Sequence, residues 1–460
     1  MPENASPLEP YFHDYSAAHR LAGPELAAMQ QQALSDRLAD LLPQLPPLAA
    51  MAQAQRLDAD VTLNDAPKLF FPHTIYKSYD PAWLLAGNFA RMTTWLQQFT
   101  TVDLKAASLP QLSSIDAWLG WLESECGIDV AHSSGTTGRM SLIARSQADA
   151  AARHARNRVG FVQLVGEQGV AEEDAWYHIV WPGAAGGRSA QQKMVEGARH
   201  MSARSPDDFL SLYDTDLGAD YEFFVVRARL ARRLGQLELP RPSPYVALKL
   251  AEADHRHALQ NEAAARMVER MTALVGERVL LMGSPHSLAA ICRAGVAAGL
   301  GGRFAGQSAH VSVGGLKGLD APPDYAEVLA GLLGNAIPVE GYGASEMNTG
   351  YMKCREGRFH VSPWVVVYVL DPAGGWQPKP REGVQEGRGA FLDLAFASAW
   401  GGLVTADHIE VDYRPCACGR HSPSISPNIR RVADSDEDFS WVPASGEGIG
   451  AALEALQQVG

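Results

Sequence analysis

The sequence predicts an α/β protein built around parallel strands, and two observations support this class. From residue 222 onward strands and helices alternate regularly, with apolar runs at 223–230, 246–250 and 279–283 and helical patterns at 261–275 and 287–298. Such alternation is typical of a parallel sheet, whose ligands bind at the carboxyl ends of the strands. The chain has 460 residues, which is long enough to bury a large core.

Local signals justify the helices of the first part of the chain. Pro24 stands in the first turn of a helix whose leucines keep a helical period up to Leu42, and Pro43 ends it. Trp and Leu recur at helical spacing in 83–100 and 114–124. We interpret these two stretches as helices that face the core.

The same reasoning gives the elements of the later part. Ser284 and Pro285 are placed as the cap and first turn of the helix at 287–298. The further expected elements are a helix at 148–165, a strand at 177–181 that ends in a glycine turn, and paired strands at 365–370 and 390–396.

Composition excludes several classes of function. The apolar fraction of 46% and the charged fraction of 20% are those of an ordinary globular protein. A net charge of −13 argues against a nucleic-acid partner, which usually needs a basic face. No apolar run reaches the ~18 residues of a transmembrane helix, no signal peptide is visible, and five cysteines do not make a disulfide framework. We therefore expect a soluble, cytoplasmic protein that binds neither nucleic acid nor a membrane.

A small, hydroxyl-rich loop lies between two segments expected to be strands, 126–130 and 140–145. Glycines allow closely spaced backbone N–H groups to form a concave anion cradle, and hydroxyls add further donors. No lysine follows the second glycine, so this is not the common nucleotide-triphosphate loop, and a solvated turn explains the composition equally well. The loop consists of Ser133, Ser134, Gly135, Thr136, Thr137 and Gly138, and Arg139 follows it.

This loop resembles the phosphate loop of the acyl-adenylate-forming (ANL) superfamily, and the closest branches are phenylacetate–CoA ligases and the acyl-protein synthetases of bacterial luciferase systems. The resemblance implies a large N-terminal adenylation domain, layered α/β/α with an additional β subdomain, over residues 65–431. A helical segment at 1–64 would pack on it. Residues 432–460 would form a short remnant, because the family's small C-terminal domain carries a lysine and Ser435–Gly460 contains none. That domain is expected to be absent or truncated.

A second motif in the expected order is Val339–Glu346, which resembles the family's Y-G-x-[ST]-E motif. The resemblance implies that Tyr342 stacks near adenine, that Gly343 and Ser345 line the nucleotide, and that Glu346 holds Mg²⁺ with the nucleotide phosphates. One carboxylate plus substrate phosphates is the usual way in which Mg²⁺ is held.

Two further stretches fit the same family. In Ser312–Gly318, Gly314 and Gly315 would border the acyl and adenine pockets, and Lys317 is either near the phosphates or a solvated surface lysine. In Gly402–His408, Asp407 matches the aspartate that grips the ribose hydroxyls, although Ala406 replaces the glycine of the family's T-G-D motif.

Near the C-terminus, Arg431 is the candidate for a ribose and phosphate contact, at the position of the family's hinge. Phenylacetate–CoA ligases also carry a Cys…Gly-x-His segment and a C-x-C-G-R turn, some of which bind structural zinc. Three thiolates and one imidazole form a closed tetrahedral set, and the alternative is three free cysteines in two unrelated turns. The residues concerned are Cys354, His360, Cys416 and Cys418.

These motifs favour ATP- and Mg²⁺-dependent activation of an aryl or acyl carboxylic acid to an acyl-AMP, with release of pyrophosphate. Glu346, Arg139 and Lys317 are the candidate catalytic residues, and Arg145 is a second candidate cation for the phosphates. The acceptor would be CoA, a carrier-protein thiol or an amine, and a homodimer is compatible with the resemblance. Two alternatives stay open: an acyl-protein synthetase that uses a protein cysteine, with Cys292 or Cys354 as candidates, and a non-catalytic nucleotide-binding scaffold.

Overall fold

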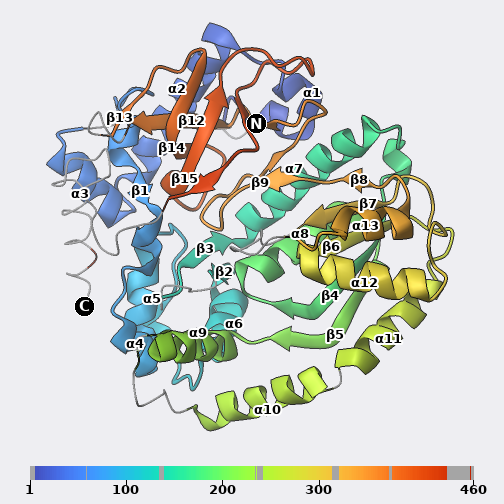
Figure 1. The fold of residues 1–460 in the computed structure, drawn as a ribbon. Helices are drawn as coiled ribbons and strands as arrows, with labels where there is room; N and C mark the ends of the chain where they lie inside the picture. Colours follow the sequence, from blue (N-terminus) through green and yellow to red (C-terminus); the bar gives the residue numbers. More distant parts are fainter. Residues whose placement is uncertain are drawn as a thin grey trace. The chain divides into compact units, whose positions relative to one another are not determined.

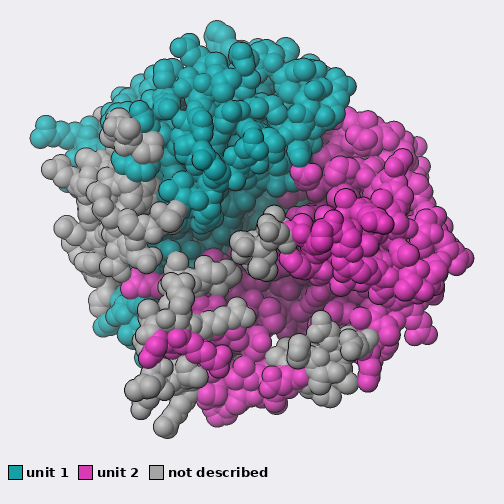
Figure 2. Space-filling model, viewed as in Figure 1, with its two compact units in different colours: residues 1–130, 141–156, 341–460 teal, residues 131–140, 157–340 magenta. Residues whose placement is uncertain are grey.

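The computed structural model describes residues 6–57, 60–133, 139–233, 235, 242–258, 260–312, 321–371, 376–432 and 456. The chain divides into two compact units (Figure 2). The first unit comprises Met1–Val130, Ser141–Arg156 and Gly341–Gly460, and the second comprises Ala131–Met140 and Asn157–Glu340. Among the described residues, no helix is both long and apolar enough to cross a membrane.

The first unit is built on a mostly antiparallel sheet (Figure 1). Its eight described strands run in the order β11-β16-β15-β14-β12-β13, and β1 and β17 pair with β15 beside this path. Only β1 is parallel to its partner. The strands are β1 (Phe71–Pro72), β11 (Phe359–His360), β12 (Val365–Asp371), β13 (Gln377–Pro378), β14 (Val384–Asp393), β15 (Gly402–Asp412), β16 (Ser424–Ile425) and β17 (Arg430–Arg431).

This sheet confirms the predicted pairing of the strands at 365–370 and 390–396. Val365 of β12 lies opposite Asp393 of β14, and the register continues to Leu370 opposite Arg388. Strand β14 begins earlier than predicted, at Val384, because its first residues form an exposed ribbon that carries little apolar signal.

Helices of the first unit pack Trp and Leu side chains into a core, as predicted. Helix α6 begins after Ser114, whose hydroxyl accepts a hydrogen bond from Ala117 N–H at 3.1 Å, and ends at Gly127 with φ +66°. Trp118 is fully buried and stacks on Phe89, with ring centroids 5.6 Å apart. The helices are α1 (Tyr15–Ala18), α2 (Gly23–Leu41), α3 (Pro46–Ala54), α4 (Pro81–Leu85), α5 (Phe89–Gln97), α6 (Ile115–Cys126) and, crossing into the second unit, α7 (Gln147–Gly166).

Two charged side chains hold the loop 396–400 between β14 and β15. Arg37 Nη2 on α2 donates to the carbonyl oxygens of Phe396, Ala399 and Trp400 at 2.8, 2.5 and 3.0 Å. Asp149, buried at the start of α7, accepts hydrogen bonds from the N–H groups of residues 397 and 398 at 2.7 and 3.0 Å. The loop's donors and acceptors are thus satisfied by ions that are themselves withdrawn from water.

The second unit contains the predicted parallel sheet. Its order is β5-β4-β6-β7-β8, and every adjacent pair is parallel. The strands are β4 (His178–Gly187), β5 (Phe209–Leu217), β6 (Val279–Gly283), β7 (Ala309–Ser312) and β8 (Ile337–Pro338). The helices are α8 (Ala190–Ser202), α9 (Ala219–Arg233), α10 (Pro244–Ala258), α11 (Gln260–Thr272), α12 (Pro285–Ala297) and α13 (Tyr325–Leu333).

Several predictions for the second unit are confirmed. Strand β6 and helices α11 and α12 lie where the alternation places them, and the Ser284 hydroxyl caps α12 by accepting from Ser287 N–H at 3.2 Å. Buried side chains from these elements form one core. Its members include Val180, Met267, Met271, Leu281, Leu288, Ile291 and Leu332.

The apolar runs at 223–230 and 246–250, counted with the strands in the alternation, lie in helices α9 and α10. Short apolar runs do not distinguish a strand from a buried helix, and the alanine, leucine and arginine around them favour the helix. The strand that precedes these helices in the chain is β5, the edge strand beside β4, whose Asp and Thr residues hide the strand pattern.

Strand β4 also runs beyond its predicted end at 181, through the glycines of the expected turn. A Cβ atom on Gly187, where φ is +149°, would lie 2.8 Å from the backbone carbonyl oxygen of Leu217 in the neighbouring strand β5. Glycine is favoured here by the close approach of the neighbouring backbone, and the glycine signal marks a crowded strand rather than a turn.

Two short pairings frame the motif loops. Strands β2 (Ile128–His132) and β3 (Leu142–Ser146) pair before and after the loop 133–138, as predicted for its flanks. In the first unit, β9 (Gly341–Tyr342) pairs antiparallel with β10 (Tyr351–Met352). This hairpin presents residues 343–350 as a turn.

Replacing Arg37 by Met should lower the free energy of unfolding of the first unit by about 3 kcal/mol or more, because carbonyl oxygens buried under the guanidinium lose charged donors. Urea unfolding followed by tryptophan fluorescence measures this. The control is Arg91→Met, an exposed arginine over the Trp83 ring, where a loss of only about 0.5–1 kcal/mol is expected. Equal losses in both variants would contradict the role given to Arg37.

Candidate functional site

Three residues from separate motifs meet on the sheet of the first unit. Tyr342 on β9 donates its hydroxyl hydrogen bond to Asp407 Oδ2 on β15 at 2.9 Å. Arg431 on β17 lies directly opposite Asp407 in the strand register, with its Nη1 3.8 Å from Asp407 Oδ1. The tyrosine and the aspartate are 65 positions apart in the chain. Strand pairing therefore brings together residues that are far apart in the sequence and that were linked only by their motifs.

The members of this group differ in burial and in charge. Tyr342 and Asp407 are only 9% and 7% exposed, whereas the Arg431 side chain is 68% exposed. Burial, reinforced by the Asp407 carboxylate, raises the pKa of Tyr342 well above its usual value, so the hydroxyl stays a donor at neutral pH. One carboxylate oxygen is thus occupied by the tyrosine, and the other lies beside an exposed cation that a polar ligand can reach.

The turn after Tyr342 carries the second candidate group. Ser345 donates from its hydroxyl to Glu346 Oε2 at 2.9 Å, and the glutamate is partly exposed. Arg145 on β3 stabilises this turn by hydrogen bonds. Its Nη2 donates to the carbonyl oxygen of Ser345 and, at 2.8 Å, to that of Met347. The backbone on both sides of Glu346 is therefore fixed by one guanidinium.

The sequence left Arg145 either as a cation for the phosphates or as a surface residue, and the structure instead buries it under the turn. Its side chain is 2% exposed, and burial lowers its pKa to about 10, which still leaves it charged at neutral pH. The carboxylates of Asp129, Glu346 and Asp149 offset part of that burial. Arg145 is a positioning residue for the turn. The only signal for it in the sequence is a charged residue inside the apolar strand at 142–146.

The remaining predicted nucleotide residues belong to the second unit. Ser133 is partly exposed and Arg139 is exposed. The other predicted residues of this group lie outside the described part of the chain: Ser134, Gly135, Thr136, Thr137, Gly138, Gly314, Gly315 and Lys317.

A histidine directly before the loop 133–138 is a feature that sequence reasoning missed. His132 is fully buried, and its Nε2 lies 3.1 Å from Glu222 Oε2 on α9. Its backbone N–H donates to the carbonyl oxygen of Arg188 at 3.0 Å. The backbone hydrogen bond to Arg188 holds the start of the loop within the second unit, and the carboxylate beside the imidazole is 90 residues away in sequence, without a local sequence signal.

The predicted metal ligands also come together. Ligand atoms of Cys354, His360, Cys416 and Cys418 all lie within 4.8 Å of one another. Ligands around a tetrahedral zinc ion are separated by roughly 3.5–4 Å, which follows from Zn–S and Zn–N bonds of about 2.3 and 2.0 Å. The four residues therefore fit a closed, structural zinc site.

Two turns of similar construction present these ligands. In each, the cysteine N–H donates to the carbonyl oxygen of an arginine four positions later, Arg358 and Arg420, at 2.9 Å. In each, a glycine with positive φ closes the turn, Gly357 at +77° and Gly419 at +95°. The repeated C-x-x-G-R pattern thus has a structural reason, because only glycine enters this backbone region without strain.

Burial controls the protonation of the side chains in this cluster. Burial lowers the pKa of His360 to about 4, so its imidazole is neutral and able to bind a metal at physiological pH. Burial also raises the pKa of the Cys418 thiol to about 12, with a contribution from the neighbouring cysteines. Thiolates form in such a place when a metal ion compensates their charge.

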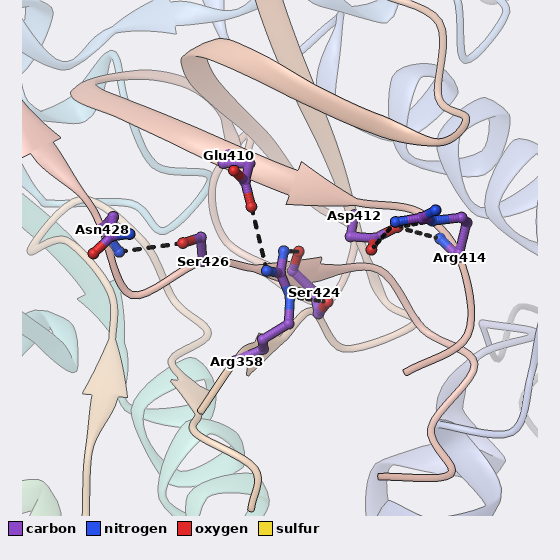
Figure 3. A network of polar contacts seen from close by, with 7 residues as sticks. All are labelled: Arg358, Glu410, Asp412, Arg414, Ser424, Ser426 and Asn428. Carbon is purple, nitrogen blue, oxygen red and sulfur yellow. Dashed lines mark hydrogen bonds and ion pairs between the residues drawn. The ribbon is translucent and has the colours of Figure 1, made fainter. Parts of the chain in front are cut away.

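Arg358 connects the first cysteine turn to the sheet (Figure 3). Its guanidinium donates to the hydroxyl and the carbonyl oxygen of Ser424 at 2.8 and 3.1 Å, and one nitrogen lies 3.3 Å from Glu410 Oε1. Ser424 belongs to β16, which follows the second cysteine turn, and Glu410 belongs to β15, which precedes it. Both turns are therefore attached to the same pair of strands.

No family model and no curated protein matches this sequence. Among solved structures that share its fold is 2-hydroxyisobutyryl-CoA ligase in complex with 2-HIB-AMP and CoA in the thioesterification state, with a TM-score of 0.53 and 13% identity over 92% of this chain and 71% of that chain. Another is the same ligase in the postadenylation state with R3-HIB-AMP, with a TM-score of 0.50 and 13% identity over 94% and 72%. The narrower placement in the phenylacetate–CoA ligase branch stays a prediction. The predicted fold is confirmed: this chain has the mixed α/β fold of 2-hydroxyisobutyryl-CoA ligase.

Proposed function

We propose that this chain activates a carboxylic acid with ATP, forming an acyl-AMP and pyrophosphate, and then transfers the acyl group to CoA. The observation that carries the proposal is the meeting of Tyr342, Asp407 and Arg431, the three residues that the adenylate-forming motifs assign to the nucleoside. The fold supports it, since it is shared with a ligase whose structures contain an acyl-AMP and CoA.

Each member of the group has a role that suits its surroundings. Asp407 would accept hydrogen bonds from the ribose hydroxyls, while the hydrogen bond from Tyr342 keeps its carboxylate in one orientation. The exposed Arg431 would contact the ribose or a phosphate. A carboxylate that is mostly buried and partly paired binds hydroxyl groups more strongly than one in water, because water competes less.

Glu346 would hold Mg²⁺ together with the phosphates. Its carboxylate is partly exposed and its backbone is clamped through Arg145, which suits a hard cation that keeps several water ligands. When bound, Mg²⁺ offsets charge on the phosphate oxygens. The proposal assigns further residues to the nucleotide on the basis of their sequence motifs alone. They are Ser133 to Gly138, Arg139, Gly314, Gly315 and Lys317.

The chemistry is a displacement at phosphorus. An oxygen of the substrate carboxylate attacks the α-phosphorus of ATP, the bond to the β-phosphate oxygen breaks, and pyrophosphate leaves. Such a reaction depends mainly on position and on charge stabilisation, so a rigid turn that fixes Glu346 contributes directly to rate.

The alternative with a protein cysteine as acyl acceptor is not favoured. Cys292 is fully buried, and burial raises the pKa of its thiol to about 12, so very little thiolate forms at neutral pH. Cys354 is buried in the candidate metal cluster. A nucleotide-binding scaffold without catalysis is tested by the experiment below.

We also propose that Cys354, His360, Cys416 and Cys418 bind one structural zinc ion. The support is their spacing, the neutral imidazole and the two matched turns described above. A closed set of four protein ligands leaves no position for substrate, so this ion would stabilise the fold rather than take part in the reaction.

Incubation with ATP, Mg²⁺ and pooled carboxylic acids should release pyrophosphate and give an acyl-AMP that mass spectrometry detects.

Glu346→Gln should lower turnover about 100-fold or more, because the metal loses its anionic ligand. Asp407→Asn should raise the KM for ATP about 10- to 100-fold, through weaker hydrogen bonds to the ribose. Glu382→Gln, an exposed acid on the β13–β14 connection, is the control. Tight ATP binding without any pyrophosphate would select the scaffold.

Arg145→Lys should lower kcat about tenfold, since a lysine cannot donate to both carbonyl oxygens of the turn with the geometry of a guanidinium. Arg145→Met should in addition destabilise the first unit by about 1–3 kcal/mol for each carbonyl left unpaired. Steady-state kinetics and urea unfolding check the two effects, with the exposed Arg303→Lys as the control. Unchanged kcat in Arg145→Lys would refute the positioning role.

Purified protein should contain about one zinc ion per chain by elemental analysis. Cys416→Ser and His360→Ala should lose most of it, whereas Cys126→Ser, a partly buried cysteine outside the cluster, should retain it. Because binding only to the folded state stabilises that state, removal with a chelator should also lower the thermal midpoint. Wild-type protein that neither contains zinc nor binds added zinc would disprove the site.

A further inference from the structure

A chain of hydrogen bonds leads from the candidate metal cluster to the N-terminal segment. His360 directs its Nε2 towards the cluster, 3.3 Å from Cys418 Sγ, and its Nδ1 lies 3.2 Å from Ser422 Oγ. The same hydroxyl lies 2.6 Å from Nδ1 of His19. All three linked side chains are at most 1% exposed. Ser422 therefore joins a predicted metal ligand to a histidine more than 300 positions away.

His19 belongs to a short stretch that packs on the second cysteine turn. It is the C-cap residue of α1, and its carbonyl oxygen accepts a hydrogen bond from His421 N–H at 2.8 Å. The Tyr15 ring lies against the His19 ring, with centroids 4.2 Å apart, and under the guanidinium of Arg420 at 5.2 Å. Residues 15–19 are thus attached to residues 420–422 through backbone, hydroxyl and aromatic contacts.

A metal at Nε2 of His360 would set the direction of the hydrogen bonds. The proton of the neutral imidazole is then on Nδ1, which donates to Ser422 Oγ. The single hydroxyl hydrogen of Ser422 is left to donate to Nδ1 of His19. The proton of His19 is consequently on Nε2, a buried atom without a hydrogen-bond partner among the described residues. In this order each donor and acceptor between the two rings is used once.

We propose that His19, acting through Ser422, is the outer hydrogen-bond partner that orients His360 for the metal ion, and that the bound metal in turn fastens residues 15–19 to the second cysteine turn. This inference rests on the proposed zinc site and extends it to the N-terminal segment. A partner of this kind fixes the tautomer and the ring orientation of a ligand, and its loss typically lowers metal affinity about 10- to 100-fold.

The first test is the rate at which zinc passes from the protein to a chromogenic chelator. His19→Leu and Ser422→Ala should release zinc about tenfold faster than wild type or more. His19→Asn should restore slow release, because its amide oxygen can take the place of Nδ1 and accept from Ser422. His421→Ala is the matched control, since that side chain is exposed and its contact with His19 is made by the backbone N–H.

The second test is hydrogen exchange of peptides that cover residues 8–22, measured with zinc bound and after chelation. Wild type should lose protection there when zinc is removed, and zinc-loaded His19→Leu should already show that loss. If His19→Leu does not fold, Ser422→Ala, a smaller change, decides instead.

The outcomes separate the two proposals. If wild type binds zinc but His19→Leu and Ser422→Ala release it as slowly as His421→Ala does, the role of His19 is overturned. The zinc site itself would remain supported. Wild type that binds no zinc would overturn both.

Discussion

A guanidinium withdrawn from water must find acceptors inside the protein, and this requirement shapes the candidate site of the first unit. Arg145 meets it with the carbonyl oxygens of Ser345 and Met347, so the turn that carries Glu346 cannot move without taking two hydrogen-bond acceptors from a buried guanidinium. Asp129 and Asp149 lie close enough to stabilise the same cation. An interaction that contacts no proposed ligand therefore determines where the proposed metal-binding carboxylate lies.

Strand β15 is the element that both candidate sites share. Asp407 lies in its middle, Arg431 is paired beside it through β17, and Glu410 near its end lies beside Arg358 of the first cysteine turn (Figure 3). The connection from β15 to β16 carries Cys416 and Cys418. A closed metal site at this connection would limit its freedom, which suits a role in shaping the sheet edge rather than in the chemistry.

The motif residues could be predicted because their chemistry is local. Tyr342, Asp407 and the four Cys and His residues were assigned through the resemblance of short motifs to the adenylate-forming family, and the structure brings the members of each group together within the first unit. The contacts of Arg145 and of the pair His132–Glu222 could not be predicted from the sequence. Their partners are distant in the chain or are backbone carbonyls, which have no sequence signature.

The sequence by itself determined the periodic elements: strand β6, helices α11 and α12 and the capped start of α12 follow from apolar spacing and from Ser and Pro at the helix start. Tertiary structure decided what short or mixed patterns leave open. The runs 223–230 and 246–250 lie in helices, and β4 continues through its glycines because they pair with β5. A long run of regularly spaced apolar residues is enough to predict a helix or a strand. For a short run, the choice between helix and strand depends on which distant segments it packs against, and those contacts exist only in the folded chain.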